Sequence, residues 1–266
     1  MDSLRLGFVG AGNMATAILD GVVAKHIFHP GQISISNPHP DKLEHATSLG
    51  VHVTSSNEEV VSASDIIVLA VKPQMYESVI HGIRDLCAGK CIVSIAAGIS
   101  TSWIRERLPG VSVIRVMPNT PLKLGLGATA IAESSDVSTS LFERVCSIFS
   151  AAGSVAVIPE CQMDDVIPVS GSSPAFFFRM IDVMVRWAQE QGMDPDVALE
   201  LAAAAMKGSA EMLLSSGVTA SELTRQVCSP GGTTLAALTA FDERDFDGLI
   251  FDAMNRCTKR SKELGK

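Results

Sequence analysis

The first 160 residues alternate short apolar runs with helical stretches. Ile66–Val71 is apolar throughout, which is typical of a strand buried on both faces of a sheet. The other expected strands are Leu4–Val9, Gln32–Ser36, Val51–Thr54, Cys91–Ile95, Ser112–Val116, Ala128–Ala132 and Val155–Ile158, and the expected helices include Met14–Lys25, Asp41–Leu49 and Asn57–Ser62. This alternation predicts βαβ units and a parallel sheet covered by helices on both faces.

After Pro159 the pattern becomes helical, and it indicates no further strand. The expected helices are Val166–Glu190, interrupted at most near Pro174, and Pro195–Leu214, Thr219–Val227, Thr233–Ala240 and Phe246–Glu263. Asp194 is suited to cap the second of them, with Pro195 at its first position. We therefore expect an α/β domain over residues 1–160 and an all-α domain over residues 161–266.

Residues 166–214 carry more apolar side chains than one amphipathic stripe needs. Part of this surface is expected to be buried against a second copy of the chain. The pattern thus predicts a homodimer formed through the helical domain.

Composition excludes several classes of function. A net charge of −8 with no basic tract argues against a nucleic-acid partner or an anionic membrane surface. No apolar run reaches the ~18 residues of a membrane span, and the N-terminus is typical of a strand rather than of a signal peptide. The 6 cysteines form no CxxC pair and have no neighbouring His that completes a zinc pattern. We expect a cytoplasmic protein with reduced thiols and no metal.

A glycine-rich segment, Gly10-Ala11-Gly12-Asn13-Met14-Ala15, follows the first strand and opens the first helix. It has the G-x-G-x-x-G/A pattern of dinucleotide-binding turns, in which the pyrophosphate lies on the helix N-terminus. The alternative is a structural glycine turn. The second strand ends at Ser36-Asn37-Pro38-His39 without the acidic residue that favours NAD. Because Ser36, Asn37 and His39 can donate hydrogen bonds to a 2′-phosphate, this end favours NADPH, with NADH also usable; the alternative is a plain polar turn.

Three more segments follow strands and are expected at the ligand-binding rim: Ala70-Val71-Lys72-Pro73, Ala96-Ala97-Gly98 and Met117-Pro118-Asn119-Thr120-Pro121. Lys72 is a catalytic acid, a phosphate contact or a surface lysine. Asn119 either holds the carboxamide or ribose of the nicotinamide end or is a turn residue between two prolines.

The helical region contains two unusual loops, Ser170–Ala175 and Cys228–Thr234. In the second, Pro230-Gly231-Gly232 forces a turn before a helix that begins with two threonines. The free N–H groups at such a helix start suit a small carboxylate. The alternative is an ordinary helix start capped by Thr233.

The segments FVGAGNMA, AVKP, SIAAGIS, RVMPNTP, SGSSPA and CSPGGTT follow one another in this order. Together they resemble pyrroline-5-carboxylate reductases over about residues 4 to 262, and MPNTP and SPGGTT are the most specific of them. The resemblance implies an N-terminal Rossmann-type domain and an all-α C-terminal dimerisation domain. It also implies homodimers that can assemble into homodecamers, and reduction of L-1-pyrroline-5-carboxylate to L-proline by NAD(P)H.

The resemblance further implies site residues. The cofactor contacts would be Val9, Gly10, Ala11, Gly12, Asn13, Met14, Asn37, Asn57, Ala70, Val71, Lys72, Pro73, Ala96, Ala97 and Gly98. The backbone of Gly231, Gly232 and Thr233 would hold the substrate carboxylate, and Thr234 would hydrogen-bond the ring nitrogen. Phe176 stands where many relatives have Tyr, so we assign no proton donor there.

Two other functions fit the residues less well. A reductase of the β-hydroxyacid dehydrogenase type needs a catalytic lysine in the helical domain, but the segment after the Ser170 loop contains Arg179, and Lys207 lies in an Ala-rich helix typical of a surface position. A non-catalytic dinucleotide-sensing protein is the other alternative.

Overall fold

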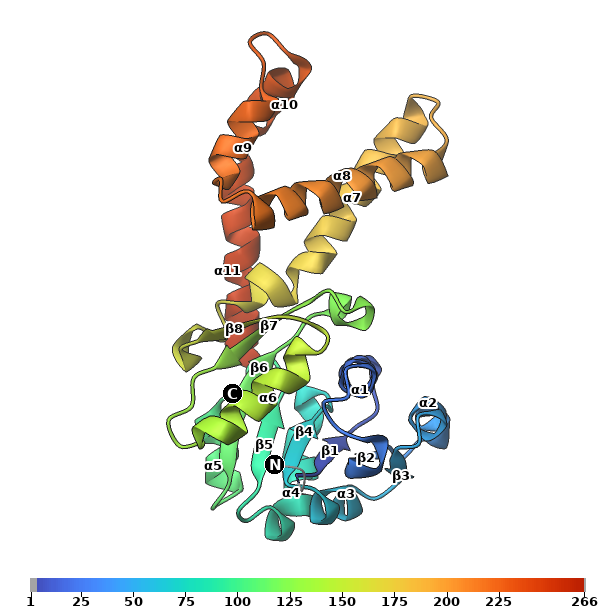
Figure 1. The fold of residues 1–266 in the computed structure, drawn as a ribbon. Helices are drawn as coiled ribbons and strands as arrows, with labels where there is room; N and C mark the ends of the chain where they lie inside the picture. Colours follow the sequence, from blue (N-terminus) through green and yellow to red (C-terminus); the bar gives the residue numbers. More distant parts are fainter. Residues whose placement is uncertain (1–3, 266) are drawn as a thin grey trace. The chain divides into compact units, whose positions relative to one another are not determined.

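The computed structural model describes residues 4–265 (Figure 1). These residues form two compact units, one from residues up to Pro174 together with those from Arg256 on, the other from Ala175 to Asn255. We call them unit 1 and unit 2. The architecture confirms an α/β region followed by an all-α region.

Unit 1 contains an eight-stranded sheet in the order β3-β2-β1-β4-β5-β6-β7-β8. The strands are β1 (Leu6–Val9), β2 (Ile33–Ser36), β3 (His52–Thr54), β4 (Ile66–Leu69), β5 (Cys91–Ser94), β6 (Ser112–Met117), β7 (Gly127–Ala132) and β8 (Gly153–Ile158). All neighbours pair in parallel except β6 and β7, which are antiparallel. The expectation of a wholly parallel sheet is therefore wrong at this pair, because the short connection between β6 and β7 leaves no room for a crossover.

Helices cover both faces of this sheet, as expected. They are α1 (Asn13–Ala24), α2 (Glu44–Ser48), α3 (Asn57–Ala63), α4 (Tyr76–Ile83), α5 (Thr101–Arg107) and α6 (Thr139–Ser150). Successive residues of a strand face opposite sides, and in β4 Ile66 packs in one apolar cluster and Ile67 in another. Residues of α1 and α6 belong to the first cluster, and residues of α3, α4 and α5 to the second.

The segment after β8 packs onto the sheet as part of unit 1. Met163 and Ile167 form a third apolar cluster with Met117 of β6 and with two residues of β7. This packing explains why unit 1 extends to Pro174, beyond the expected domain boundary near residue 160. The division into an α/β domain over residues 1–160 and an all-α domain over residues 161–266 stays a prediction.

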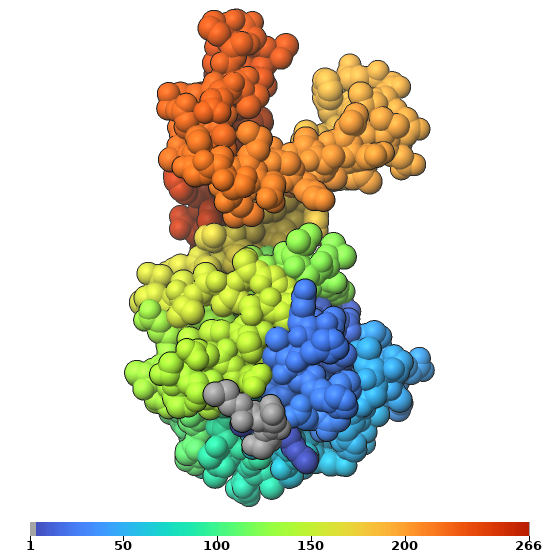
Figure 2. Space-filling model, in the orientation of Figure 1, coloured from blue at the N-terminus to red at the C-terminus, as the bar shows by residue number. Residues whose placement is uncertain are grey.

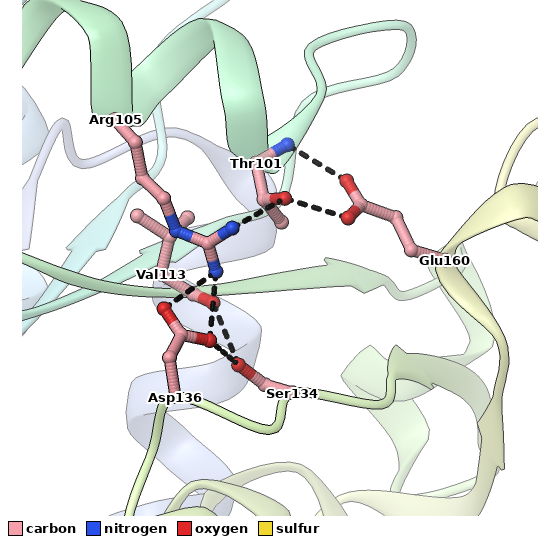
Figure 3. Close-up of polar contacts among 6 residues, drawn as sticks. All are labelled: Thr101, Arg105, Val113, Ser134, Asp136 and Glu160. Carbon is pink, nitrogen blue, oxygen red and sulfur yellow. Dashed lines mark hydrogen bonds and ion pairs between the residues drawn. The ribbon is translucent and has the colours of Figure 1, made fainter.

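Polar contacts tie the same segment to α5. The carboxylate of Glu160 accepts hydrogen bonds from the amide and the hydroxyl of Thr101, at 2.7 and 2.6 Å. Figure 3 shows this pair beside Arg105, whose guanidinium donates to the Thr101 hydroxyl and pairs with Asp136. The connection from β8 is thereby held against the first turn of α5.

Unit 2 is helical, and the described chain contains no strand after β8, as expected. Its helices are α7 (Ser173–Glu190), α8 (Pro195–Ser215), α9 (Ala220–Val227), α10 (Thr233–Asp242) and the first part of α11 (Phe246–Leu264). The Asp194 carboxylate caps α8 by accepting from two backbone N–H groups, which confirms that expectation. The interruption expected near Pro174 lies just before it, at Ser172, between a π-helical turn over Ile167–Gly171 and α7.

Large apolar side chains of unit 2 remain exposed. Trp187 of α7 is 64% exposed, Leu214 of α8 84% and Phe251 of α11 66%. In the space-filling view, long stretches of α8 and of the α9–α10 segment form surface on the face drawn (Figure 2). Among the described helices none is long and apolar enough to cross a membrane.

Candidate active site

The turn after β1 begins the candidate dinucleotide site. Gly10 has a φ of +100°, and a Cβ there would lie 2.9 Å from the carbonyl oxygen of Ala70, so only glycine suits this position. The Gly10 amide donates to the Ser36 carbonyl at 3.0 Å and so joins the turn to the end of β2. Gly12 is the N-cap of α1 and supplies no side-chain cap. The first N–H groups of α1 are therefore available to an anion.

A cavity of about 560 Å³ lies where β1, β4, β5 and β6 end. Because these four strands are parallel, their carboxyl ends meet at one edge of the sheet, which is where open α/β sheets bind ligands. A Cβ added to Gly12 would meet no atom within 4 Å, so there is open space directly beside the start of α1. The site therefore fits the pyrophosphate of a dinucleotide.

The cavity brings together many of the expected cofactor contacts. These are Gly12, Asn13, Met14, Ala70, Val71, Lys72, Pro73, Ala96 and Ala97. Expected residues outside its lining are Val9, Gly10, Ala11, Ser36, Asn37, Asn57, Gly98 and Asn119. The contacts themselves stay predictions, since the structure describes the chain alone.

Pro118 also lines the cavity and belongs to a segment expected at the rim, although no cofactor contact was assigned to it. Three lining residues were missed by the sequence reasoning: Gln74, Ile95 and Leu264. Gln74 and Ile95 adjoin expected segments, so the strand-end rule applied one residue more widely would have found them. Leu264 belongs to the last turn of α11, far along the chain, and no local signal marks it.

Lys72 is the charged residue of the cavity lining. It is exposed and precedes a short 3-10 turn over Pro73–Met75. A cation among lining residues that are otherwise uncharged favours an anionic ligand. Of the three roles left open for Lys72, this position supports the phosphate contact.

The end of β2 presents an amide rather than a carboxylate. The Ser36 side chain is fully buried, and its hydroxyl donates to Asn57 Oδ1 at 2.7 Å. Asn37 is half-buried, and its Oδ1 accepts from the His39 amide at 3.0 Å. The oxygen of Asn37 is thus occupied, which leaves its Nδ2 group to donate. Ser36 orients Asn57, and its own expected contact with the cofactor stays a prediction.

Asn119 has a different set of partners. It is 6% exposed, its Nδ2 donates to the Ser170 carbonyl at 3.0 Å and its Oδ1 accepts from the Ala128 amide at 2.9 Å. Both ends of the amide therefore bind the chain itself and join the end of β6 to β7 and to the Ser170 loop. This arrangement is that of a structural connector, and the expected contact with the nicotinamide end stays a prediction.

The second candidate site lies in unit 2, at the start of α10. Gly231 has a φ of +70°, which favours glycine, and a Cβ on Gly232 would displace the Ser229 hydroxyl. Gly232 is the N-cap of α10. The alternative in which Thr233 caps this helix is therefore wrong, because Thr233 is already the first helical residue.

The hydroxyls of Thr233 and Thr234 have no hydrogen-bond partner within residues 4–265. Thr233 is exposed and Thr234 half-buried. The first turn of α10 contains no acidic residue. The Gly232 amide already donates to the Ser229 carbonyl at 2.9 Å, whereas the amides of Gly231 and Thr233 have no partner among the described residues. Two free amides and two free hydroxyls at a helix start are suited to bind a small carboxylate beside a polar atom.

The regions that match known proteins include both candidate sites. Residues 5–98 match the family model described as NADP oxidoreductase, coenzyme F420-dependent, and residues 160–264 match that of pyrroline-5-carboxylate reductase dimerisation. The pyrroline-5-carboxylate reductase of Methanosarcina acetivorans is 37% identical, with 100% of each chain covered. The chain belongs to the pyrroline-5-carboxylate reductase family.

Two further comparisons extend this result. The Escherichia coli pyrroline-5-carboxylate reductase is 37% identical over 98% of each chain. The crystal structure of the Plasmodium falciparum pyrroline carboxylate reductase with NADP bound has a TM-score of 0.91 and 28% identity, with 100% of each chain covered. Both sites described above thus lie in regions shared along the full length of the family members.

A reductase of the β-hydroxyacid dehydrogenase type would need a catalytic lysine in the helical domain, and the two candidate positions do not supply one. Lys207 of α8 is exposed, and the early part of α7 contains Arg179 instead of a lysine. Within residues 4–265 no group of three or more His, Cys, Asp or Glu could hold a metal ion. All 6 cysteines are unpaired, and burial raises the pKa of the Cys87 thiol to about 11. The expectation of a metal-independent reaction stays a prediction.

Proposed function

We propose that this family member reduces L-1-pyrroline-5-carboxylate to L-proline with NADPH. The observation that carries the proposal is full-length similarity to reductases of this substrate, with the glycine-rich turn and the Pro-Gly-Gly helix start both present. When bound, NADPH supplies the hydride, which adds to the carbon of the C=N bond. The ring nitrogen, protonated from water, becomes the amine of proline.

Residues of unit 1 bind the cofactor. The first N–H groups of α1 hold the pyrophosphate, and Lys72 adds a positive charge at the same rim. Asn37 Nδ2 donates to the 2′-phosphate, supported by the occupied oxygen of that side chain. Because no carboxylate ends β2, NADPH is preferred, and NADH remains usable. The Plasmodium relative with NADP bound supports this choice.

Residues of unit 2 bind the substrate. The N–H groups of Gly231 and Thr233 at the start of α10 hold the carboxylate, because a helix N-terminus favours an anion. The expected contribution of the Gly232 amide is wrong, since that amide donates to the Ser229 carbonyl at 2.9 Å. Thr234 is the proposed catalytic residue: its hydroxyl hydrogen-bonds the ring nitrogen and assists proton delivery through water. The imine is more electrophilic when protonated, so no histidine relay is required.

The family model over residues 160–264 is a dimerisation domain, and the chain is accordingly a homo-oligomer. We propose a homodimer as its basic unit, with a homodecamer as a further assembly. Exposed apolar side chains such as Phe178, Trp187 and Leu201 support an interface along α7 and α8. The unpaired cysteines support the proposal that the protein functions in a reducing compartment, the cytoplasm.

A direct assay tests the function. Purified protein mixed with pyrroline-5-carboxylate should consume NADPH and form proline in equal amounts, as followed by NADPH absorbance and amino-acid analysis. The protein should also restore growth of a proline auxotroph. NADPH formation from NADP⁺ with a β-hydroxyacid, together with no NADPH consumption with the cyclic imine, would overturn the proposal.

A further inference from the structure

The last turn of α11 supplies a wall of the cofactor cavity. Leu264 is half-buried and lines the cavity together with Ala96, Ala97 and Pro118. Those three residues follow β5 and β6. Leu264 therefore completes the cavity from the far end of the chain, at the side where β5 and β6 end.

The backbone of this turn lies directly on the loop after β5. Gly98 has a φ of +79°, and a Cβ there would overlap the Ser261 carbonyl oxygen and lie 2.9 Å from the Gly265 nitrogen and 3.1 Å from Leu264 Cβ. The approach is possible because Gly98 has no side chain. The loop expected to contact the cofactor is thus in van der Waals contact with the turn that carries Leu264.

Buried polar contacts hold the turn in this place. Ser261, 3% exposed, donates from its hydroxyl to Asp164 Oδ1 at 2.6 Å. Arg115 of β6, also 3% exposed, donates to the same oxygen at 2.7 Å. Lys262 pairs with Asp165 at 3.3 Å on the surface. A charge-assisted network centred on Asp164 thus fixes the end of α11 to the sheet.

The sheet order shows which part of a dinucleotide this wall would meet. β2, whose end is the expected 2′-phosphate site, lies on one side of β1, and β4, β5 and β6 lie on the other. A dinucleotide with its pyrophosphate at the start of α1 therefore extends its nicotinamide half over the ends of β4 to β6.

We propose that Leu264 contacts the nicotinamide half of NADP(H) and that its apolar side chain forms the wall of that subsite. The proposal rests on the proposed use of this cavity by NADP(H). Leu264 contributes binding energy to the intact dinucleotide and none to its adenosine half, because the wall lies on the opposite side of β1 from the end of β2.

Two ligands separate these contributions. Calorimetric titration of the full-length protein with NADP⁺ and with adenosine 2′,5′-bisphosphate measures the whole cofactor and its adenosine half. Leu264→Ala should weaken NADP⁺ binding by about three- to tenfold, as expected for loss of a partly buried apolar side chain. Binding of adenosine 2′,5′-bisphosphate should be unchanged. Leu264→Met, which restores apolar volume, should recover most of the NADP⁺ affinity.

Leu86→Ala is the matched control, since it makes the same truncation at an exposed position of unit 1 before β5. It should alter neither affinity. Unchanged NADP⁺ binding by Leu264→Ala, or an equal loss of affinity for both ligands, would overturn the proposal about Leu264. In either case, binding of NADP⁺ by the wild-type protein would still support the proposed function. Failure of the wild-type protein to bind NADP⁺ would overturn both.

Discussion

Unit 1 and unit 2 bury their apolar residues in different ways. In unit 1, all four residues of β4 have 0% exposure, because helices cover both faces of the sheet. In unit 2, α9 and α10 contain no buried residue, and α8 buries only Ala198. Unit 1 has a core made by its own chain, whereas many large apolar side chains on the helices of unit 2 stay exposed, and the proposed homodimer would cover them. Folding of unit 2 and oligomerisation are therefore expected to be coupled.

The largest effect is expected from a charge placed on α7 at the exposed position of Trp187. Trp187→Asp should dissociate the dimer and abolish most activity. A large apolar side chain contributes about 1.5–3 kcal/mol when buried and counts twice in a two-fold interface, so the dimer dissociation constant should rise by at least about 100-fold. Sedimentation velocity of dilute protein measures it.

Gln189→Asp is the control for Trp187→Asp, because it adds the same charge at an exposed polar position of the same helix. This variant should stay dimeric and active. If Trp187→Asp also stays dimeric, α7 does not form the interface.

The core of unit 1 should be sensitive to truncation in a way that its surface is not. Ile67→Ala removes a side chain of 0% exposure from β4 and should lower the free energy of unfolding by about 2–5 kcal/mol. Leu124→Ala, at a position 79% exposed, should change it by less than about 0.5 kcal/mol. Urea unfolding measures both, and similar losses would contradict the assignment of the core.

Substitution of Thr234 tests whether a residue of unit 2 takes part in the reaction. Thr234→Val keeps the shape without the hydroxyl and should lower kcat by about tenfold to a few hundredfold, equivalent to about 1.5–3 kcal/mol for a hydrogen bond to a charged group. The KM for NADPH should hardly change. Thr234→Ser should keep most activity.

A purely structural role for Thr234 predicts the opposite result, with a lower melting temperature and near-normal turnover in Thr234→Val. Steady-state kinetics and thermal unfolding of the same two variants decide between these roles.

The smallest expected effect concerns cofactor choice in unit 1. Asn37→Asp places a carboxylate at the end of β2, where it repels a 2′-phosphate and can accept from a ribose 2′-OH. The ratio of kcat/KM for NADPH to that for NADH should fall by about tenfold, as for one lost charge-assisted hydrogen bond. Asn37→Ser removes the amide without adding charge and should have a weaker effect. An unchanged ratio in Asn37→Asp would exclude Asn37 from the 2′-phosphate site.

Much of unit 1 was predictable because its signals are local. An apolar run such as Ile66–Val71 identifies a strand covered on both faces, and Gly10 marks a turn that only glycine permits. The Asp194 cap also depends only on neighbours in the chain. The antiparallel direction of β7 was not predicted, because it depends on how the short β6–β7 connection folds.

The amino-acid sequence by itself determined the two-part fold, the position of the glycine-rich turn and the Pro-Gly-Gly helix start, since each depends on residues close together in the chain. The tertiary structure alone decided that Asn119 binds the backbone at both ends of its amide, that the Ser36 hydroxyl turns inward to Asn57, and that Leu264 reaches the cavity. These outcomes depend on which distant segments meet. Packing in the folded chain determines the partners of a side chain, and the local sequence pattern does not indicate them.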